Sequence, residues 1–292
     1  KVDVMIDLWC YRRNGHNEAD EPSFTQPVMY KAIENHPTVR QLYEQRLLAE
    51  GRITQDELDV MKSEVVARLN AARDQAKEIK ARSKVPTFGG VWKGLGRAGG
   101  DWSANTKVGR EVLQRVLDVY GKMPDGFTPH PKVLKGVIEK RQEMLQTGKG
   151  IDWGCAEMLA WGSLLIEGYG IRLTGQDVER GTFSHRHAVL NDYETGNKWF
   201  SLDQLGRKPG DFTIINSMLS EFAVLGFEWG YASANPRTLV MWEAQFGDFV
   251  NGAQCIIDQI ISSAESKWRY ANGMALLLPH GMEGAGPEHS NA

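Results

Sequence analysis

The sequence of 292 residues lacks any apolar run of the length, about 18 residues, that a membrane span needs. Residues 1–30 do not resemble a signal peptide. There is no block of basic residues, and 34 Lys and Arg against 37 Asp and Glu give a net charge of −3. These features argue against a membrane protein and against a partner such as nucleic acid or an anionic membrane surface. They favour a small-molecule ligand.

Cysteine is scarce. Cys10, Cys155 and Cys255 are odd in number, far apart and set in apolar stretches, which predicts buried, reduced thiols in an intracellular protein. The sequence has no internal repeat and no low-complexity tract. With 41% hydrophobic and 24% charged residues, it has the composition of an ordinary globular protein of one large or two medium domains.

Phosphate-binding motifs are also lacking. Residues 86–110 are rich in glycine and contain Trp92 and Trp102, but GxxxxGK[ST] is absent and no strand leads into a GxGxxG. An interdomain loop that packs the two tryptophans is the better interpretation.

The periodicity predicts helices in the first half of the chain. Residues 27–33, 38–49 and 54–82 fit helices, and Thr54 with Glu57 resembles a capping box. The last of these helices carries many charges, which favours a solvated face and a connector between domains. Two amphipathic helices are expected at residues 108–120 and 131–146, and a helix led by Asp152 should end near Gly168.

Four apolar runs are predicted to form buried strands, at residues 2–9, 171–174, 238–241 and 274–278. In open α/β sheets, ligands bind at the carboxyl ends of the strands. The loop at residues 11–22 offers Arg12, Arg13 and His16 there, the loop at 175–187 ends in Ser-His-Arg-His, and the glycine-rich loop at 279–290 carries His280 and His289. A metal at His185 and His187 is disfavoured because no cysteine or acid is suitably spaced.

The organising segment runs from Ile214 to Phe249. A polar turn ends in Leu219-Ser220-Glu221, a helix follows through Tyr231, and residues 238–241 form the next strand. Glu221 thus begins a helix, where the helix dipole and the free N–H groups favour a carboxylate. Its position alone favours the interpretation of Glu221 as a capping acid over a functional one.

Four segments carry a family resemblance: SEFAVLGFEWGYA, WEAQFGDFVNGAQ, TGQDVERGTFSHRH and LLPHGMEGAGPEHS. In this order and spacing they resemble the thiamine-diphosphate-dependent first component of the 2-oxoglutarate dehydrogenase complex. The resemblance covers nearly the whole chain and is weakest over residues about 80–130. It implies an α/β thiamine-diphosphate-binding fold, with a parallel sheet flanked by helices and a helical connector region.

The implied domains are residues 1–23, the end of a diphosphate-binding domain, residues 24–150, a helical connector and interdomain loop, and residues 151–292, a pyrimidine-binding domain cut short at its end. The chain begins directly before a strand and ends directly after a motif, so a piece of a longer polypeptide is expected. The compartment would be the cytoplasm in a bacterium and the mitochondrial matrix in a eukaryote.

The resemblance also implies the site residues. Glu221 matches the glutamate that drives the imino form of the cofactor's aminopyrimidine, and burial against Leu219, Phe222 and Phe249 would favour a carboxyl group that is protonated or shares its proton. Phe249 matches the ring that stacks on the aminopyrimidine, and His289 matches a histidine that gives a proton during catalysis. The remaining expected residues are His187 as a catalytic residue and His16, Gln245 and Asp177 around the cofactor. Gln245 and Asp248 are expected to form walls and hydrogen bonds rather than to react.

Thiamine diphosphate and Mg²⁺ are the implied cofactors. The implied partners are 2-oxoglutarate, the lipoyl domain of dihydrolipoyl succinyltransferase and a second copy in a homodimer, and the implied pathway is the tricarboxylic acid cycle. The family's GDG…N motif for Mg²⁺ does not occur in this sequence. The segment alone is therefore expected to be inactive, with the Mg²⁺ ligands upstream.

Three alternatives stay open. A 2-oxoadipate dehydrogenase component would look the same, because the discriminating contacts are expected upstream. A metal hydrolase could use His280, Glu288 and His289, and a truncated, non-catalytic scaffold would only dimerise or dock partners. The fold prediction is sharper: the strand ends should gather Asp177, His187, Glu221, Phe249 and His289 at one edge of the sheet.

Overall fold

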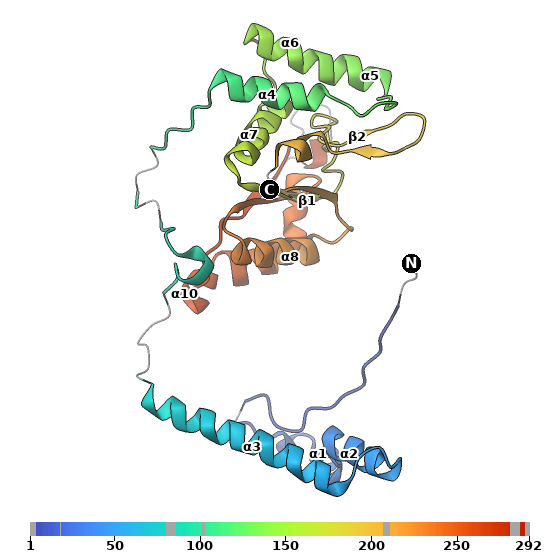
Figure 1. Ribbon diagram of the computed structural model, residues 1–292, viewed down its shortest axis with the longest axis vertical. Helices are drawn as coiled ribbons and strands as arrows, with labels where there is room; N and C mark the ends of the chain where they lie inside the picture. Colours follow the sequence, from blue (N-terminus) through green and yellow to red (C-terminus); the bar gives the residue numbers. More distant parts are fainter. Residues whose placement is uncertain are drawn as a thin grey trace. The chain divides into compact units, whose positions relative to one another are not determined.

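The computed structural model describes residues 4–17, 19–79, 86–97, 99–100, 103–206, 211–280 and 287–289. The chain divides into two compact units, Lys1–Arg82 and Ser83–Ala292, and each is described by itself (Figure 1). None of the helices in the described ranges is long and apolar enough to cross a membrane. The predicted elements that include Trp102, residues 80–85 and residues 281–286 lie partly or wholly outside the described residues.

The first unit is helical, and its second and third α-helices begin at capping boxes. It contains a 3₁₀ turn, Pro22–Phe24, followed by α1 (Pro27–Asn35), α2 (Val39–Ala49) and α3 (Gln55–Glu78). Thr54 accepts a hydrogen bond from the backbone N–H of Glu57, and the Glu57 side chain accepts one from Thr54 in return. The predicted capping box is confirmed, and Thr38 forms a second one with Gln41.

The strand predicted at residues 2–9 is wrong over the part that the structure describes. Residues 4–10 have no regular secondary structure, and Met5 and Trp9 are 95% and 90% exposed. A strand needs a neighbour to receive its backbone hydrogen bonds, and the described residues of the first unit contain no strand. Cys10 is consequently exposed, as is Cys255, so the prediction of buried thiols holds only for Cys155.

The second unit is built on a parallel sheet. Its strands run in the order β4 (Phe212–Asn216), β1 (Gly170–Gly175), β5 (Thr238–Glu243) and β6 (Ala275–Leu277). A separate antiparallel pair joins β2 (Leu190–Asn191) to β3 (Lys198–Trp199). The predicted strands at residues 171–174, 238–241 and 274–278 are confirmed as β1, β5 and β6.

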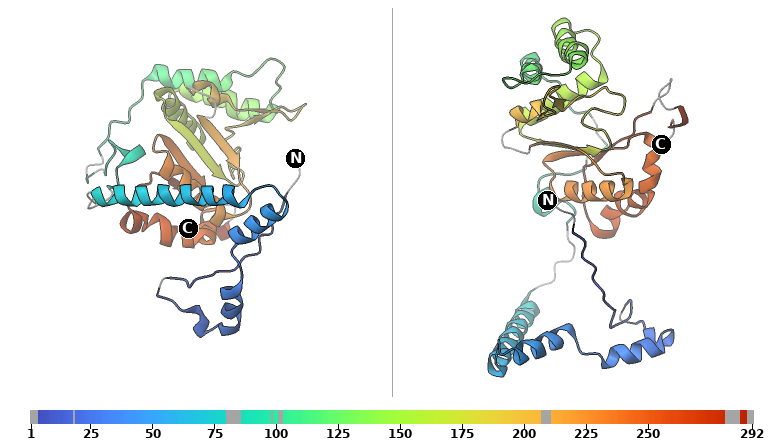
Figure 2. Two further views of the ribbon diagram at one scale, coloured as in Figure 1. Left: turned by 60° about the horizontal axis from the view of Figure 1, so that its bottom comes forward. Right: turned by 90° about the vertical axis from the view of Figure 1, so that its right-hand side faces the viewer.

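Helices cover both faces of this sheet. Helix α7 (Trp153–Glu167) lies on one face, with α4 (Arg110–Gly121) and α6 (Lys140–Thr147) beyond it, and α8 (Glu221–Ala234) lies on the other (Figures 1 and 2). Ile171 and Leu173 of β1 belong to the core on the α7 side, whereas Arg172 pairs with Glu228 of α8 at 2.6 Å. Successive side chains of β1 thus point to opposite faces of the sheet and contact the helices on both sides. The predicted α/β fold, a parallel sheet flanked by helices, is confirmed.

Helix α7 has the ends that the sequence predicts. Asp152 caps it by accepting a hydrogen bond from the N–H of Cys155, and Gly168 ends it in the left-handed conformation.

The other helical segments are short. The helix predicted at 131–146 is present but contains a π-helical stretch, and the helical segment over residues 247–261 changes type along its length. These segments are Gly90–Trp92 (η2), Pro131–Val133 (α5), Leu134–Glu139 (η3, π), Ser201–Leu205 (η4), Gly247–Ala253 (η5), Gln254–Ile256 (α9), Ile257–Ile261 (η6, π), Ala264–Trp268 (α10) and Pro287–His289 (η7).

Gly175 closes the central strand at a point of close backbone contact. Its φ is +151°, and a Cβ there would lie 2.1 Å from the carbonyl oxygen of Glu243 on β5. We expect Gly175→Ala to lower the free energy of unfolding by about 1–3 kcal/mol, because the two strands must separate and the backbone is strained. Urea unfolding tests this. The matched control is Gly196→Ala in the β2–β3 turn, where no atom lies within 4 Å, so that only the cost of its φ of +72° remains. Equal losses in the two variants would contradict the close-contact argument.

Candidate functional site at the carboxyl edge of the sheet

The carboxyl ends of the four parallel strands lie at one edge, and most of the predicted site residues follow them. The structure places them directly after the strands: Asp177 after β1, Glu221 after β4, Gln245 and Phe249 after β5, and His280 and His289 after β6. Backbone hydrogen bonds tie these loops together, with Ser217 N donating to Gly175 O at 2.7 Å and Gly247 N donating to Pro279 O at 2.9 Å. The edge is therefore one connected surface.

Glu221 is the first residue of α8 and is held from the neighbouring strand end. Ser220 caps the helix, accepting from the N–H of Ala223 at 3.3 Å. Gln176 Nε2 donates to Glu221 Oε1 at 2.9 Å, and Oε2 lies only 3.2 Å from the position that a Cβ on Gly252 would take. Because Ser220 already caps the helix, the Glu221 carboxylate is free to interact outside it. Gln176, the residue that orients it, was not predicted from the sequence.

The predicted burial of Glu221 against Leu219 and Phe222 is wrong. Leu219 is 84% exposed and Phe222 is 53% exposed, while Glu221 itself is half-buried. Leu219 lies in the turn before the cap, and Phe222 is turned by about 100° around the helix from Glu221. Phe249, the third expected neighbour, is 37% exposed. The surroundings of Glu221 are therefore an open, partly aromatic surface.

An aromatic cluster lies on the adjoining loops. The ring of His289 stacks on Phe246 with centroids 4.6 Å apart and an interplanar angle of 25°, and Phe249 lies 4.9 Å from the same imidazole. Phe183, from the loop after β1, meets Phe246 edge-on at 5.8 Å. Phe249 and His289 are thus brought together as predicted, and Phe246 joins them.

Two more of the predicted residues are paired. Gln245 Nε2 donates to Asp177 Oδ2 at 3.2 Å, and Arg180 lies 3.6 Å from the same oxygen. The pair ties the loop after β1 to the loop after β5. Gln245 thus makes a hydrogen bond, as expected from the sequence, and its place in the wall of a cofactor site stays a prediction.

His187 lies elsewhere on this edge. It has a left-handed φ of +46°, and its Nε2 lies 3.0 Å from both the carbonyl oxygen and the hydroxyl of Ser184. It lines a cavity of about 310 Å³ together with Asp177, Arg180 and Asn216. Within the described residues it makes no hydrogen bond or ring contact with Glu221, Phe249 or His289. The structure therefore groups His187 with Asp177 and not with the aromatic cluster.

Burial lowers the pKa of both histidines of this loop. For His187 desolvation is the main cause, opposed by the backbone of Ser184, and for His185 desolvation acts together with the positive charge of Arg186. The unfolded chain therefore binds these protons more readily than the folded protein. The contribution of the two neutral rings to the free energy of unfolding should be fully present above the unfolded pKa of about 6.5, and it should decrease as the pH falls below that value.

We expect the urea midpoint to decrease between pH 7.5 and pH 5.5 for this reason. The His185→Asn/His187→Asn double variant should lose less stability over the same interval. The difference from the wild type is at most about 1.4 kcal/mol per pH unit for each histidine, since each takes up one proton on unfolding. The His16→Asn variant, which removes an exposed histidine of the first unit, serves as control. An unchanged pH dependence in the double variant would contradict burial of the two rings.

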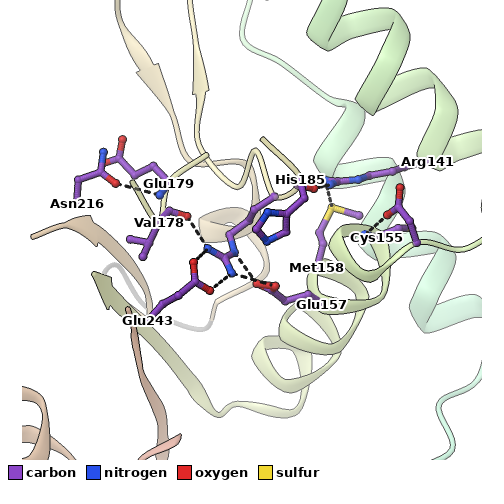
Figure 3. A network of polar contacts seen from close by, with 11 residues as sticks. Arg141, Cys155, Glu157, Met158, Val178, Glu179, His185, Asn216 and Glu243 are labelled. Carbon is purple, nitrogen blue, oxygen red and sulfur yellow. Dashed lines mark hydrogen bonds and ion pairs between the residues drawn. The ribbon is translucent and has the colours of Figure 1, made fainter. Parts of the chain in front are cut away.

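A buried ion-pair cluster anchors the loop that follows β1, and it was not predicted from the sequence. Arg186 is 3% exposed; its Nη1 donates to Glu243 Oε1 at 2.8 Å and to Val178 O at 3.1 Å, and its Nε donates to Glu157 Oε1 at 2.6 Å. In Figure 3, dashed lines from Glu157 on α7 and from Glu243 at the end of β5 mark their bonds with Arg186, which is drawn without a label. The only sequence signal was a charged residue between two histidines.

The pKa directions in this cluster follow from burial and pairing. Burial raises the pKa of Glu157, although its hydrogen bond with Arg186 opposes the effect. Burial alone would lower the pKa of Arg186, but the hydrogen bonds with Glu243 and Glu157 and their charges outweigh it, so that its pKa is raised. Arg186 therefore remains charged and joins α7, β5 and the loop after β1.

A larger cavity adjoins the edge. It has a volume of about 630 Å³ and lies between η3, α6, the start of α7 and the loops after β1 and β6. Lys140, Arg141, Trp153, Phe183, His185 and His280 are among the residues that line it. His280 also packs on the backbone of Gly247, where a Cβ would lie 2.5 Å from its ring.

His16 belongs to the first unit and is described there. Its Nδ1 lies 3.2 Å from Arg12 Nη1, and its backbone N–H donates to Asp20 Oδ2 at 3.1 Å. It is exposed. As for metals, no group of three His, Cys, Asp or Glu side chains suited to an ion was found in the parts of the chain that the structure describes, and this includes His280, Glu288 and His289.

Two family models match the chain. The model described as "Transketolase, pyrimidine binding domain" matches residues 149–292, and "Dehydrogenase E1 component" matches residues 1–84. Among curated relatives, the 2-oxoglutarate dehydrogenase E1 components of Brucella ovis and Brucella melitensis biotype 2 are each 49% identical over 296 aligned residues. The alignments cover 99% of this chain and 29% of each relative. The chain thus spans less than a third of the length of these relatives.

The parallel sheet, the helices on both its faces and the matched model define residues 149–292 as a transketolase-type pyrimidine-binding domain, the kind found in thiamine-diphosphate enzymes. Over 99% of its length, the chain is similar to 2-oxoglutarate dehydrogenase E1 components, and it corresponds to one segment of them. The resemblance noted in the sequence is confirmed.

Proposed function

We propose that this chain is the segment of a thiamine-diphosphate-dependent 2-oxoglutarate dehydrogenase that binds the pyrimidine half of the cofactor. The whole enzyme would decarboxylate 2-oxoglutarate oxidatively and pass the succinyl group to the lipoyl group of dihydrolipoyl succinyltransferase in the tricarboxylic acid cycle. The 49% identity over 99% of the chain supports this reaction and substrate. A bacterial host, as for the relatives, would place the protein in the cytoplasm.

The observation that supports the proposal is the position of the Glu221 carboxylate. It lies against the backbone of Gly252, and Gly252 follows one helical turn after Phe249, whose ring is exposed. A carboxylate beside an aromatic face suits a flat heterocycle that offers an amine and ring nitrogens. A side chain at position 252 would crowd Glu221 Oε2, so Gly252 keeps the space beside that oxygen open. We infer that this is the place of the aminopyrimidine.

The residues would divide the work as follows. Thiamine diphosphate, when bound, supplies the nucleophilic carbon that attacks a 2-oxo acid. Glu221, oriented by Gln176, would exchange a proton with a ring nitrogen of the aminopyrimidine. Phe249 would stack on that ring, and His289 would hold or donate a proton near the substrate oxygen.

We also propose roles for the remaining site residues. Asp177 and Gln245 would close the wall beside the cofactor, His187 would act from the neighbouring cavity, and His16 would approach the diphosphate. We place the Mg²⁺ ligands in the part of the relatives that this chain does not cover, because the GDG…N motif is absent from it. The domain boundaries after residues 23 and 150 also remain predictions.

A second copy of the enzyme is the proposed partner at this edge. Met218, Leu219 and Phe222 are 85%, 84% and 53% exposed, and they lie next to Glu221 in the sequence. Apolar side chains gathered around a polar site are typical of a surface that becomes buried in an assembly. A homodimer would cover them and shield the cofactor from water.

Turnover by the full-length enzyme tests the proposed function. We expect lipoyl-dependent oxidation of 2-oxoglutarate with thiamine diphosphate and Mg²⁺ present, and a clearly lower kcat/KM with 2-oxoadipate, whose chain is one methylene longer. One methylene typically changes this ratio by about 10–200-fold. Preference for 2-oxoadipate would overturn the substrate assignment, and failure with both acids would favour a non-catalytic scaffold.

A further inference from the structure

Asp248 and His289 form a hydrogen-bonded pair between two loops. Asp248 follows β5, His289 follows β6, and His289 Nδ1 lies 2.9 Å from Asp248 Oδ2. Both side chains are about a quarter exposed, at 25% and 26%. The pair therefore lies at the boundary between the protein and the ligand-binding edge.

The carboxylate has no structural task that would explain it. Asp248 is in the first turn of η5, but no side chain caps that helix, so the acid is not its cap. Its second oxygen, Oδ1, is buried and has no hydrogen-bond partner among the described residues. A buried acceptor without a donor is costly. Among the described residues, the side-chain contact of this carboxylate is the one with His289.

The imidazole is fixed in every direction by this neighbourhood. Stacking on Phe246 sets the plane of the ring, and Phe249 limits its tilt. Asp248 then sets the rotation within that plane, so that Nδ1 faces the carboxylate and Nε2 faces the opposite way. Glu288 Oε1, at 3.8 Å from Nε2, is too distant for a hydrogen bond.

An ionised carboxylate only accepts hydrogen bonds, so its imidazole partner must carry hydrogen on Nδ1. Nε2 of the neutral ring is then free to accept a proton, and the protonated ring can donate it there. Pairs of this kind orient histidines and select their tautomer in many enzymes.

We propose that Asp248 is a positioning residue, which holds His289 in the Nδ1–H tautomer and directs Nε2 toward the reacting substrate. The inference rests on the proposed function only where it assigns His289 to the substrate. The pairing and the tautomer are properties of this chain and can be measured without cofactor or turnover.

Histidine-selective ¹⁵N labelling of the 292-residue chain tests the tautomer directly. The chain has seven histidines, and loss of one ring signal in His289→Gln assigns the residue of interest. We expect long-range ¹H–¹⁵N spectra above pH 8 to show His289 as the Nδ1–H tautomer. Asp248→Ala should shift it toward the Nε2–H form, whereas Glu288→Gln, which removes a charge on the other side of the same ring, should leave it unchanged.

The wild-type spectrum alone can overturn the proposal. An Nε2–H tautomer of His289 in the unmodified chain would do so whether or not Asp248→Ala folds, and so would equal effects of Asp248→Ala and Glu288→Gln. Circular dichroism establishes that each variant is folded before its spectrum is compared.

Kinetics of the full-length enzyme then test the consequence. Asp248→Ala should lower kcat by about 10²-fold or more and change KM little, because it misplaces a proton-transfer group without removing a binding contact. If the tautomer depends on Asp248 but the wild-type enzyme does not turn over 2-oxoglutarate, the pairing stands and the proposed function fails. If the enzyme turns over and Asp248→Ala matches it, the positioning role fails.

Discussion

Replacing Glu221 by Gln in the full-length enzyme is expected to lower 2-oxoglutarate turnover by about 10²–10⁴-fold, the usual loss for one positioned acid–base group. The amide keeps the shape of the carboxyl group and can still contact Gln176, but it cannot exchange a proton with a ring nitrogen. Affinity for thiamine diphosphate should change only modestly. The comparison requires turnover per folded, cofactor-bound molecule.

A role confined to helix capping gives the opposite pattern. Gln at a helix start would cost up to about 1 kcal/mol of stability and leave turnover per folded molecule nearly intact. Glu111→Gln in the first turn of α4 is the matched control, since it removes a carboxylate from another helix start in the same unit. If Glu221→Gln and Glu111→Gln behaved alike, Glu221 would be a structural residue.

Replacing Arg186 by Met is expected to lower the free energy of unfolding by about 3–5 kcal/mol, because it leaves buried carboxylates without their partner. Glu243 is 3% exposed, and Glu157 is 22% exposed. The loop carrying Phe183 and His187 should also lose its anchor to β5. Equilibrium unfolding in urea, followed by tryptophan fluorescence, measures the loss.

Two further variants separate pairing from packing. Arg97→Met breaks a pair with Glu265 in which the arginine is 74% exposed, and its cost should stay within about 1 kcal/mol. Combining Arg186→Met with Glu243→Gln and Glu157→Gln should recover part of the lost stability, because no buried charge remains unpaired. A triple variant no more stable than Arg186→Met would show that the charges are not the cause.

Local signals in the sequence were sufficient for much of the fold. Thr54 with Glu57, Asp152 and Gly168 mark helix ends through contacts that span only a few residues, and the structure reproduces them. Strands β1 and β5 were equally clear, because their apolar runs are buried by helices on both faces. The position of Glu221 at the start of α8 follows from the same kind of signal.

Burial was harder to predict, because it depends on what lies nearby in space. Residues 4–10 have the composition of a buried strand and yet are exposed in the described chain, since no strand there receives their hydrogen bonds. Cys10, Cys255 and Leu219 were misjudged for the same reason: an apolar neighbourhood in sequence does not make a buried position.

The candidate site, too, could be predicted only where local signals in the sequence were sufficient. The rule that ligands bind at the carboxyl ends of parallel strands brought Asp177, Glu221 and Phe249 to one edge. The side chains that orient the others escaped prediction, because Gln176 meets Glu221 across 45 residues and Arg186 meets Glu243 across 57. Such pairings depend on strand order and register, which no periodicity in the chain specifies.

The central claim is that Glu221 exchanges a proton with the aminopyrimidine of thiamine diphosphate. The measurement closest to it is the rate at which the full-length enzyme exchanges the thiazolium C2 proton of its bound cofactor for deuterium, followed by quenched-flow NMR in the wild type and in Glu221→Gln. We predict fast exchange in the wild type and a rate at least about 10²-fold lower in the variant at equal cofactor occupancy. Exchange at the wild-type rate in Glu221→Gln would contradict the assignment.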